Sequence, residues 1–156
     1  MAKTVKHGSR PQYMIELDEI ISFLEGKGYG IERDVSKGYE FNSEYVEVYA
    51  NAVAVARGIR YVMVRREENG RPLTPLERFS VAVARLLGVR GYAVTSNGEE
   101  VMCLRVDTGE KVDVEEIPDA EEAEPFDFEF DEGKELRIAV AIGKLRCPCR
   151  QGECRL

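Results

Sequence analysis

Several residue types are scarce in this chain of 156 residues, and their scarcity excludes some classes of protein. There is one histidine, His7, and there are no tryptophans. Because Ser80, Thr95 and Ser96 have no histidine near them in the sequence, a Ser-His-Asp triad is not supported. The longest apolar run is far below the roughly 20 residues of a membrane span. The N-terminus has no apolar stretch of the signal-peptide kind. The sequence therefore predicts a cytoplasmic protein without a membrane span.

Glutamine and asparagine are also rare, whereas arginine and glutamate are plentiful. This bias is compatible with a thermophilic source. Hydrophobic residues make up 44% of the chain and charged residues 33%, which excludes a mainly disordered or collagen-like protein. No glycine-rich phosphate loop is present. The length predicts about one domain.

The net charge of −7 conceals an uneven distribution. Residues 113–135 hold 12 acids and one base, and the rest of the chain holds 17 acids and 21 bases. The stretch 57–90 contains eight arginines against three glutamates. Such a surplus suits either phosphate contact or a solvated, salt-bridged surface. The candidate nucleic-acid contacts are Arg57, Arg60, Arg65, Arg66 and Arg71, and the acidic segment could screen them. The partner would be DNA or another protein of a nucleic-acid-processing system.

Hydrophobic periodicity predicts three helices and five strands. Turns are expected at Lys37-Gly38, at Arg57-Gly58 and, as a type I′ hairpin, at Asn97-Gly98. Thr74 is expected to cap the second helix, with Glu77 closing a capping box. The order predicts an α/β fold with a mixed central sheet built from hairpins and flanked by helices. The predicted helices are 12–25, 74–87 and 133–146, and the predicted strands are 29–36, 45–56, 59–66, 92–95 and 101–106.

Composition divides the chain into four parts. Residues 1–10 form a basic N-terminal tail, and residues 11–112 form the α/β core. Residues 113–135 form an acidic segment, in which one short helix near 119–123 and an extended stretch with alternating phenylalanines are expected. Residues 136–156 hold the last helix and a cysteine-rich tail.

Several stretches, taken in order, resemble the N-terminal domain of type I restriction enzyme R subunits and the stand-alone archaeal proteins like it. In that family a Gly-Tyr follows the first helix, and a helix ending in Ala-Arg-Leu-Leu precedes a Thr-Asn-Gly hairpin, then Asp-Thr-Gly, then Ile-Pro. The resemblance covers about residues 12–120 and implies the PD-(D/E)XK, restriction-endonuclease-like fold. The matching segments here are Gly28-Tyr29, Ala84-Arg85-Leu86-Leu87, Thr95-Ser96-Asn97-Gly98, Asp107-Thr108-Gly109 and Ile117-Pro118.

In that fold one strand carries an aspartate and the next carries Glu-x-Lys, and the carboxylates hold Mg²⁺. If Arg57-Gly58 is a two-residue loop, Asn51 faces Val64, and Arg66 lies on the same side. The metal-binding positions would then be Asn51 and Val64, with Arg66 in place of the lysine. Mg²⁺ prefers anionic oxygens, so these three residues argue against nuclease chemistry.

Three functions remain open on this sequence. The first is a non-catalytic, nucleic-acid-associated or interaction module derived from a restriction-type nuclease. The second is an active Mg²⁺-dependent nuclease that uses relocated carboxylates, either Glu67 and Glu68 beyond the strand or Glu16 and Glu19 on the first helix. The third is a small metal- or cluster-binding protein on a nuclease-like scaffold.

The third possibility depends on four cysteines: Cys103, Cys147, Cys149 and Cys154. The last three lie close together, but their C-x-C-x4-C spacing is not that of common zinc ribbons. A Zn²⁺ or iron–sulfur site, a disulfide and reduced thiols all remain possible. Cys103 is as compatible with a buried core thiol as with a ligand.

Overall fold

The computed structural model describes residues 15–144 and 153–156, and it shows one mixed sheet of seven strands. The strand order is β1-β2-β3-β4-β5-β6, and β7 pairs with β2. The β3–β4 and β2–β7 pairs are parallel, and all others are antiparallel. The predicted mixed sheet flanked by helices is therefore confirmed. The elements are α1 (Leu17–Gly26), β1 (Gly30–Phe41), β2 (Glu44–Ala56), β3 (Ile59–Arg66), α2 (Glu77–Leu86), β4 (Tyr92–Ser96), β5 (Val101–Arg105), β6 (Lys111–Val112), α3 (Glu132–Gly143) and β7 (Glu153–Arg155).

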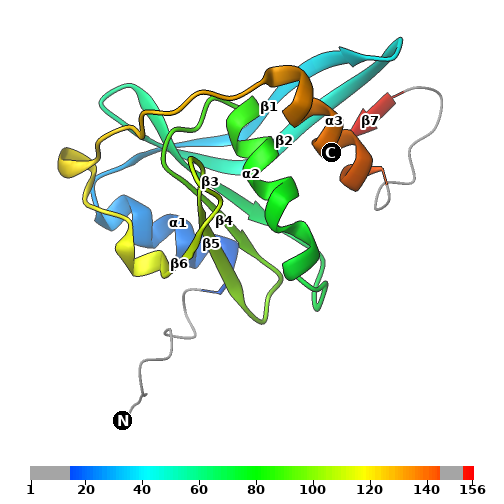
Figure 1. The fold of residues 1–156 in the computed structure, drawn as a ribbon. Helices are drawn as coiled ribbons and strands as arrows, with labels where there is room; N and C mark the ends of the chain where they lie inside the picture. Colours follow the sequence, from blue (N-terminus) through cyan, green and yellow to red (C-terminus); the bar gives the residue numbers. More distant parts are fainter. Residues whose placement is uncertain (1–14, 145–152) are drawn as a thin grey trace.

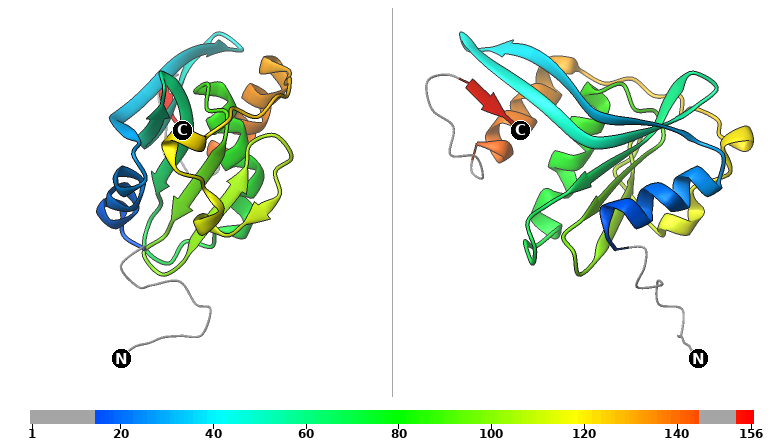
Figure 2. Two further views of the ribbon diagram at one scale, coloured as in Figure 1. Left: turned by 90° about the vertical axis from the view of Figure 1, so that its left-hand side faces the viewer. Right: turned by 180° about the vertical axis from the view of Figure 1, so that it is seen from behind.

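Two hydrophobic clusters lie on the two faces of the sheet (Figures 1 and 2). On one face α1 packs through Ile20, Ile21 and Leu24. On the other face α2 and α3 pack side by side, with Phe79 completely buried between them and the sheet. Alternate residues of the strands point to opposite faces, so the buried strands supply both clusters. No helix in residues 15–144 is long and apolar enough to cross a membrane.

The acidic segment forms an extended strap, which we define as residues 113–131. It runs over the cluster on the α1 side and then on to the cluster formed by α2 and α3, against which Phe128 packs. Its apolar side chains are buried against the sheet, while the acids between them point outward. Two short 3-10 turns, Val114–Glu116 and Ala120–Glu122, interrupt it, and the second lies where a helix was predicted. The phenylalanines of its last part lie in extended chain that forms no strand. The buried strap residues are Val114, Ile117, Ala120 and Ala123.

Three local predictions were wrong. Lys37-Gly38 is inside β1, and the chain turns instead at Asn42-Ser43, where both residues have positive φ. Thr74 begins a 3-10 turn that runs to Leu76, so α2 starts at Glu77 and has no side-chain cap. The type I′ hairpin predicted at Asn97-Gly98 is instead a four-residue loop, because Ser96 pairs with Val101. Asn97 Oδ1 closes this loop by accepting from the amides of Glu99 and Glu100.

Candidate functional site

The β2–β3 hairpin carries the positions expected to form a nuclease site, and its register differs from the prediction. Next to the Arg57-Gly58 turn, Ala56 pairs with Ile59 and Val55 with Arg60, as expected. The register then shifts by one residue at a β-bulge, and Ala52 lies opposite Val64. The predicted Asn51–Val64 pair is therefore wrong.

The bulge has a packing cause at Tyr61, the residue of β3 without a partner in the β2–β3 register. Its ring is 2% exposed and packs within 6.1 Å, centroid to centroid, of Tyr29, Tyr92 and Phe126. An extra residue in one strand re-aims a side chain in this way. Burial, the largest cause, raises the pKa of Tyr61 to about 12, so this phenol is neutral at pH 7.

Asn51 and Arg66 still meet, but through a structural contact. Asn51 Oδ1 accepts from the backbone N–H of Arg66 at 2.7 Å, and Asn51 Nδ2 donates to Tyr49 Oη at 3.3 Å. The guanidinium of Arg66 donates to the backbone oxygen of Glu67 and, at 3.4 Å, to Glu16 Oε1. Val64 is completely buried. Both polar side chains at the candidate positions are thus engaged with the protein itself.

A kink beside this site was missed by sequence reasoning. Asp34 has φ +53°, and the alternation of β1 and β2 changes phase there: Ala50 packs in the α2-side cluster and Ala52 in the α1-side cluster. Tyr49 Oη donates to Asp34 Oδ1 at 2.6 Å. Burial first, and then Asp34, raises the pKa of Tyr49. The sequence around Asp34 is that of an ordinary strand. The one signal for a kink there is that aspartate tolerates a left-handed backbone better than most residues.

Glu67 and Glu68, two of the carboxylates considered for a relocated metal site, belong to two separate ion pairs. Glu67 is 4% exposed, and its Oε2 accepts from Arg65 at 3.2 Å. Glu68 is exposed and accepts from Arg71 at 3.1 Å. Among residues 15–144 and 153–156, no group of three or more His, Cys, Asp or Glu side chains is placed to hold a metal ion.

The five candidate nucleic-acid-binding arginines all make contacts within the chain. Arg57 donates to the backbone oxygens of Ala120, Glu121 and Ala123, and so holds the strap against the hairpin turn. Arg60 donates to Glu32 and to the backbone oxygen of Leu87. Arg65, Arg66 and Arg71 make the contacts given above. Carbonyl partners do not neutralise a guanidinium, so the positive charge of Arg57 persists at the surface.

The strap presents the opposite charge over a long surface. Arg90 donates to the backbone oxygens of Phe126 and Phe128, at 2.9 Å each, and Arg105 lies over the Phe126 ring. These contacts, which sequence reasoning missed, hold the strap down and leave its carboxylates in solvent. The exposed acids are Asp113, Glu115, Glu116, Asp119, Glu121, Glu122, Glu124, Asp127, Glu129, Asp131 and, just beyond the strap, Glu132.

The predicted cysteine site lies mostly outside the described residues. Cys147 and Cys149 are there, and only the backbone of Cys154 is described, as part of β7. Cys103 is on β5, 2% exposed, and packs in the α1-side cluster. A Zn²⁺ or iron–sulfur site that includes the three C-terminal cysteines remains a prediction.

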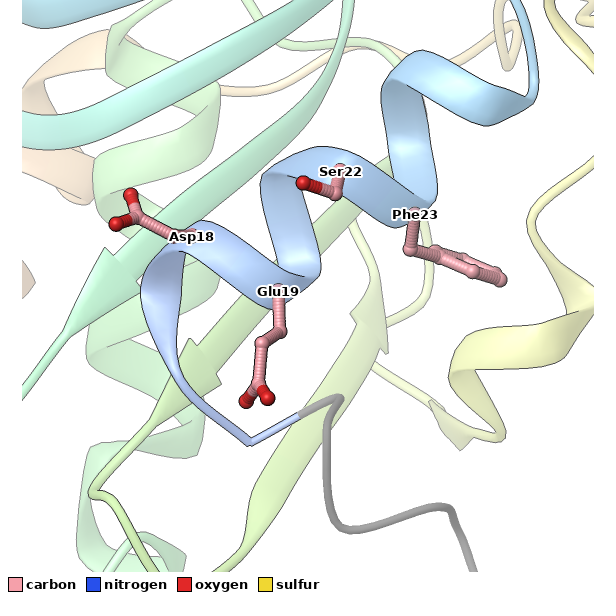
Figure 3. A pocket seen from close by; sticks show the side chains of 4 residues that line it. All are labelled: Asp18, Glu19, Ser22 and Phe23. Carbon is pink, nitrogen blue, oxygen red and sulfur yellow. The ribbon is translucent and has the colours of Figure 1, made fainter.

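A hollow lies beside α1 (Figure 3). It is lined by Asp18, Glu19, Ser22 and Phe23. Figure 3 shows that Asp18 and Phe23 point in different directions, so these side chains do not converge on a ligand. The hollow therefore carries no chemistry.

Comparison of this chain with protein-family models, with curated proteins and with solved structures finds no match.

The hydrogen bond from Arg66 to Asn51 gives a stability prediction. Asn51→Val leaves a partly buried backbone N–H without its acceptor, so we expect a loss of about 1–3 kcal/mol in the free energy of unfolding. Asn51→Asp keeps an acceptor oxygen and should lose less. Urea denaturation of both variants measures the difference. Equal stability of Asn51→Val and the unchanged protein would show that the contact contributes nothing.

Proposed function

We propose that this chain is a non-catalytic association module, a degenerate relative of a restriction-type nuclease that works in a nucleic-acid-processing system of the cytoplasm. The observation that carries the proposal is that Asn51, Val64 and Arg66 stand where a restriction-type nuclease would have its carboxylates and lysine. In the restriction-endonuclease-like fold, neighbouring strands supply the carboxylates and the lysine, and β2 and β3 are such neighbours. In the observed register Ala52 lies opposite Val64, and Asn51 lies next to it. Whichever of the two takes the aspartate position, it supplies a methyl group or an amide. Together with the buried Val64 and with Arg66, neither makes an Mg²⁺ site.

The charge distribution favours a protein partner over tight nucleic-acid binding. The guanidiniums that a phosphate would need already donate to backbone oxygens or pair with glutamates. The exposed carboxylates of the strap repel a phosphate backbone. Any affinity for DNA is then weak and electrostatic, and it comes from the charge of Arg57, Arg60, Arg66 and Arg71. Arg65 is 6% exposed and pairs with the buried Glu67, so its side chain does not reach a duplex.

Changing the salt concentration and removing charges from the strap both test whether binding to DNA is electrostatic. The affinity for a fluorescent DNA duplex should fall with salt, with a slope of log K against log[salt] of about −0.9 for each phosphate contacted. Changing Glu115, Glu116, Glu121 and Glu122 to Gln should raise the affinity, because those side chains are exposed and point away from the core. Deleting the strap is not a clean test, since its apolar residues are buried.

Fluorescence anisotropy at 50 and 200 mM salt measures both effects. Substituting four exposed acids outside the strap by their amides, at Asp18, Glu25, Glu40 and Glu110, provides the matched control. An affinity unchanged by salt and by the strap substitutions would exclude the electrostatic explanation.

A further inference from the structure

Strand β7 pairs with β2 and lies beside the end of α3 (Figures 1 and 2), and we call the place that residues 153–156 occupy there the slot. It pairs in parallel with Tyr45–Glu47 of β2, beyond the part of β2 that pairs with β3. The backbone N–H of Leu156 continues this ladder by donating to the oxygen of Glu47 at 2.7 Å. Arg155 lies over the Tyr49 ring, with its Cζ 3.6 Å from the centroid. The slot thus binds an extended backbone along one strand edge.

The side chain of Leu156 occupies a closely fitted apolar seat. It is 4% exposed and belongs to the cluster formed by α2, α3 and the sheet. Gly143, the last residue of α3, forms the wall of this seat. A Cβ at Gly143 would lie 2.6 Å from Leu156 Cδ2, closer than real Cβ contacts allow, and 3.2 Å from Phe79 Cε1. The missing side chain at Gly143 therefore makes room for an aliphatic side chain in the slot.

A buried cation forms the end of the slot. Arg65 is 6% exposed, and its NH1 group donates to the backbone oxygens of Leu156, at 3.1 Å, and Tyr49, at 2.6 Å. Its NH2 group pairs with Glu67, and its Cζ lies 5.0 Å from the centroid of the Phe79 ring. Arg65 is thereby fixed in a position where it recognises the carbonyl oxygen of the residue in the aliphatic seat.

We propose that this slot is a peptide-binding site for an extended segment of a partner protein that carries a large aliphatic residue, and that residues 153–156 occupy it as an internal competitor. The bound segment shows the chemistry recognised: strand pairing with β2, an aliphatic side chain at Gly143, and a carbonyl oxygen at Arg65. Addition of a strand to an exposed edge with a pocket for a side chain is an established mode of peptide recognition. This inference does not depend on the nuclease resemblance.

A competitor within the same chain is present at a high effective concentration, so the unchanged protein should bind such peptides weakly. Leu156→Ala removes most of the aliphatic side chain from the internal segment. Because burial of a leucine side chain stabilises an association by enough to change affinity about tenfold or more, the variant should bind a competing peptide at least that much more tightly.

The experiment uses the full chain and a labelled peptide with the sequence of residues 151–156, carrying Cys154→Ser. Fluorescence anisotropy should show about tenfold or tighter binding to the Leu156→Ala protein than to the unchanged protein. A peptide that also carries Leu156→Ala should bind to neither. Absence of binding to both proteins, or equal binding to both, would overturn the proposal.

A thermodynamic cycle tests the seat without any peptide. Gly143→Ala should lower the melting temperature of the unchanged protein, because its Cβ meets Leu156. In the Leu156→Ala background the same substitution should lower it less or raise it, since alanine favours helix more than glycine does. An equal decrease in both backgrounds would show that Leu156 does not fill this seat, and the slot proposal would then fail.

Discussion

Replacing Glu135 with Gln is expected to lower the free energy of unfolding by about 3 kcal/mol, because it breaks a buried ion pair. Glu135 is 1% exposed and lies between two arginines of α2. Arg78 donates to both of its carboxylate oxygens, at 2.7 and 2.8 Å, and Arg85 donates at 2.9 Å. These contacts join α3 to α2. Without the carboxylate charge, two guanidiniums face each other with no anion between them.

The effect should depend on pH in a defined direction. Burial alone would raise the pKa of Glu135, but the hydrogen bonds and charges of Arg78 and Arg85 outweigh it and hold the pKa below its usual range. The ionised pair therefore stabilises the fold above the unfolded-state pKa of about 4.3, and this stabilisation is lost as the pH falls through the lower folded-state pKa. Urea midpoints of both proteins measured from pH 7 to pH 3 should converge at the acidic end. A difference between the two urea midpoints that stays constant from pH 7 to pH 3 would contradict the pairing of Glu135 with the two arginines.

Arg65→Met is expected to destabilise the fold by a similar amount, about 3–5 kcal/mol, because it removes the cation next to the buried Glu67. It also removes the donor to the backbone oxygens of Tyr49 and Leu156. Chemical denaturation monitored by circular dichroism measures the loss.

A second substitution separates the charge from the packing. In Arg65→Met with Glu67→Leu, both partners are apolar, and such replacement of a buried ion pair is often close to neutral. The double variant should therefore be more stable than Arg65→Met alone, with the remaining loss due to the two carbonyl groups. If the loss of the double variant equals the sum of the losses of Arg65→Met alone and Glu67→Leu alone, the two side chains are not coupled in the fold.

Much of the fold could be predicted because local patterns determine it. The β3 bounds match the prediction at Ile59 and Arg66, and Arg57-Gly58 forms the expected hairpin turn with φ of +51° and +78°. Strand 29–36 was identified but ended too early, since the polar sequence of β1 continues to Phe41 as an exposed edge strand. A lysine followed by a glycine is a weak turn signal when a neighbouring strand can pair across it.

The candidate site was harder to predict because tertiary packing determines it. A register derived from a turn holds only until the first bulge, and the bulge at Tyr61 arises from an aromatic cluster whose members are distant in sequence. The destinations of the arginines are equally non-local. Arg57 reaches Ala120, and Arg65 reaches Leu156, so a local surplus of arginine cannot distinguish a phosphate-binding surface from structural contacts.

A cleavage assay decides whether a protein with Asn51, Val64 and Arg66 at these positions lacks nuclease activity. An excess of the purified protein is incubated with plasmid DNA and with labelled RNA, in Mg²⁺ or Mn²⁺. We expect no cleavage above that of buffer alone, and no difference between the unchanged protein and Asn51→Val, Glu67→Gln or Glu68→Gln. Reproducible metal-dependent cleavage that any one of these three substitutions abolishes would contradict a non-catalytic module.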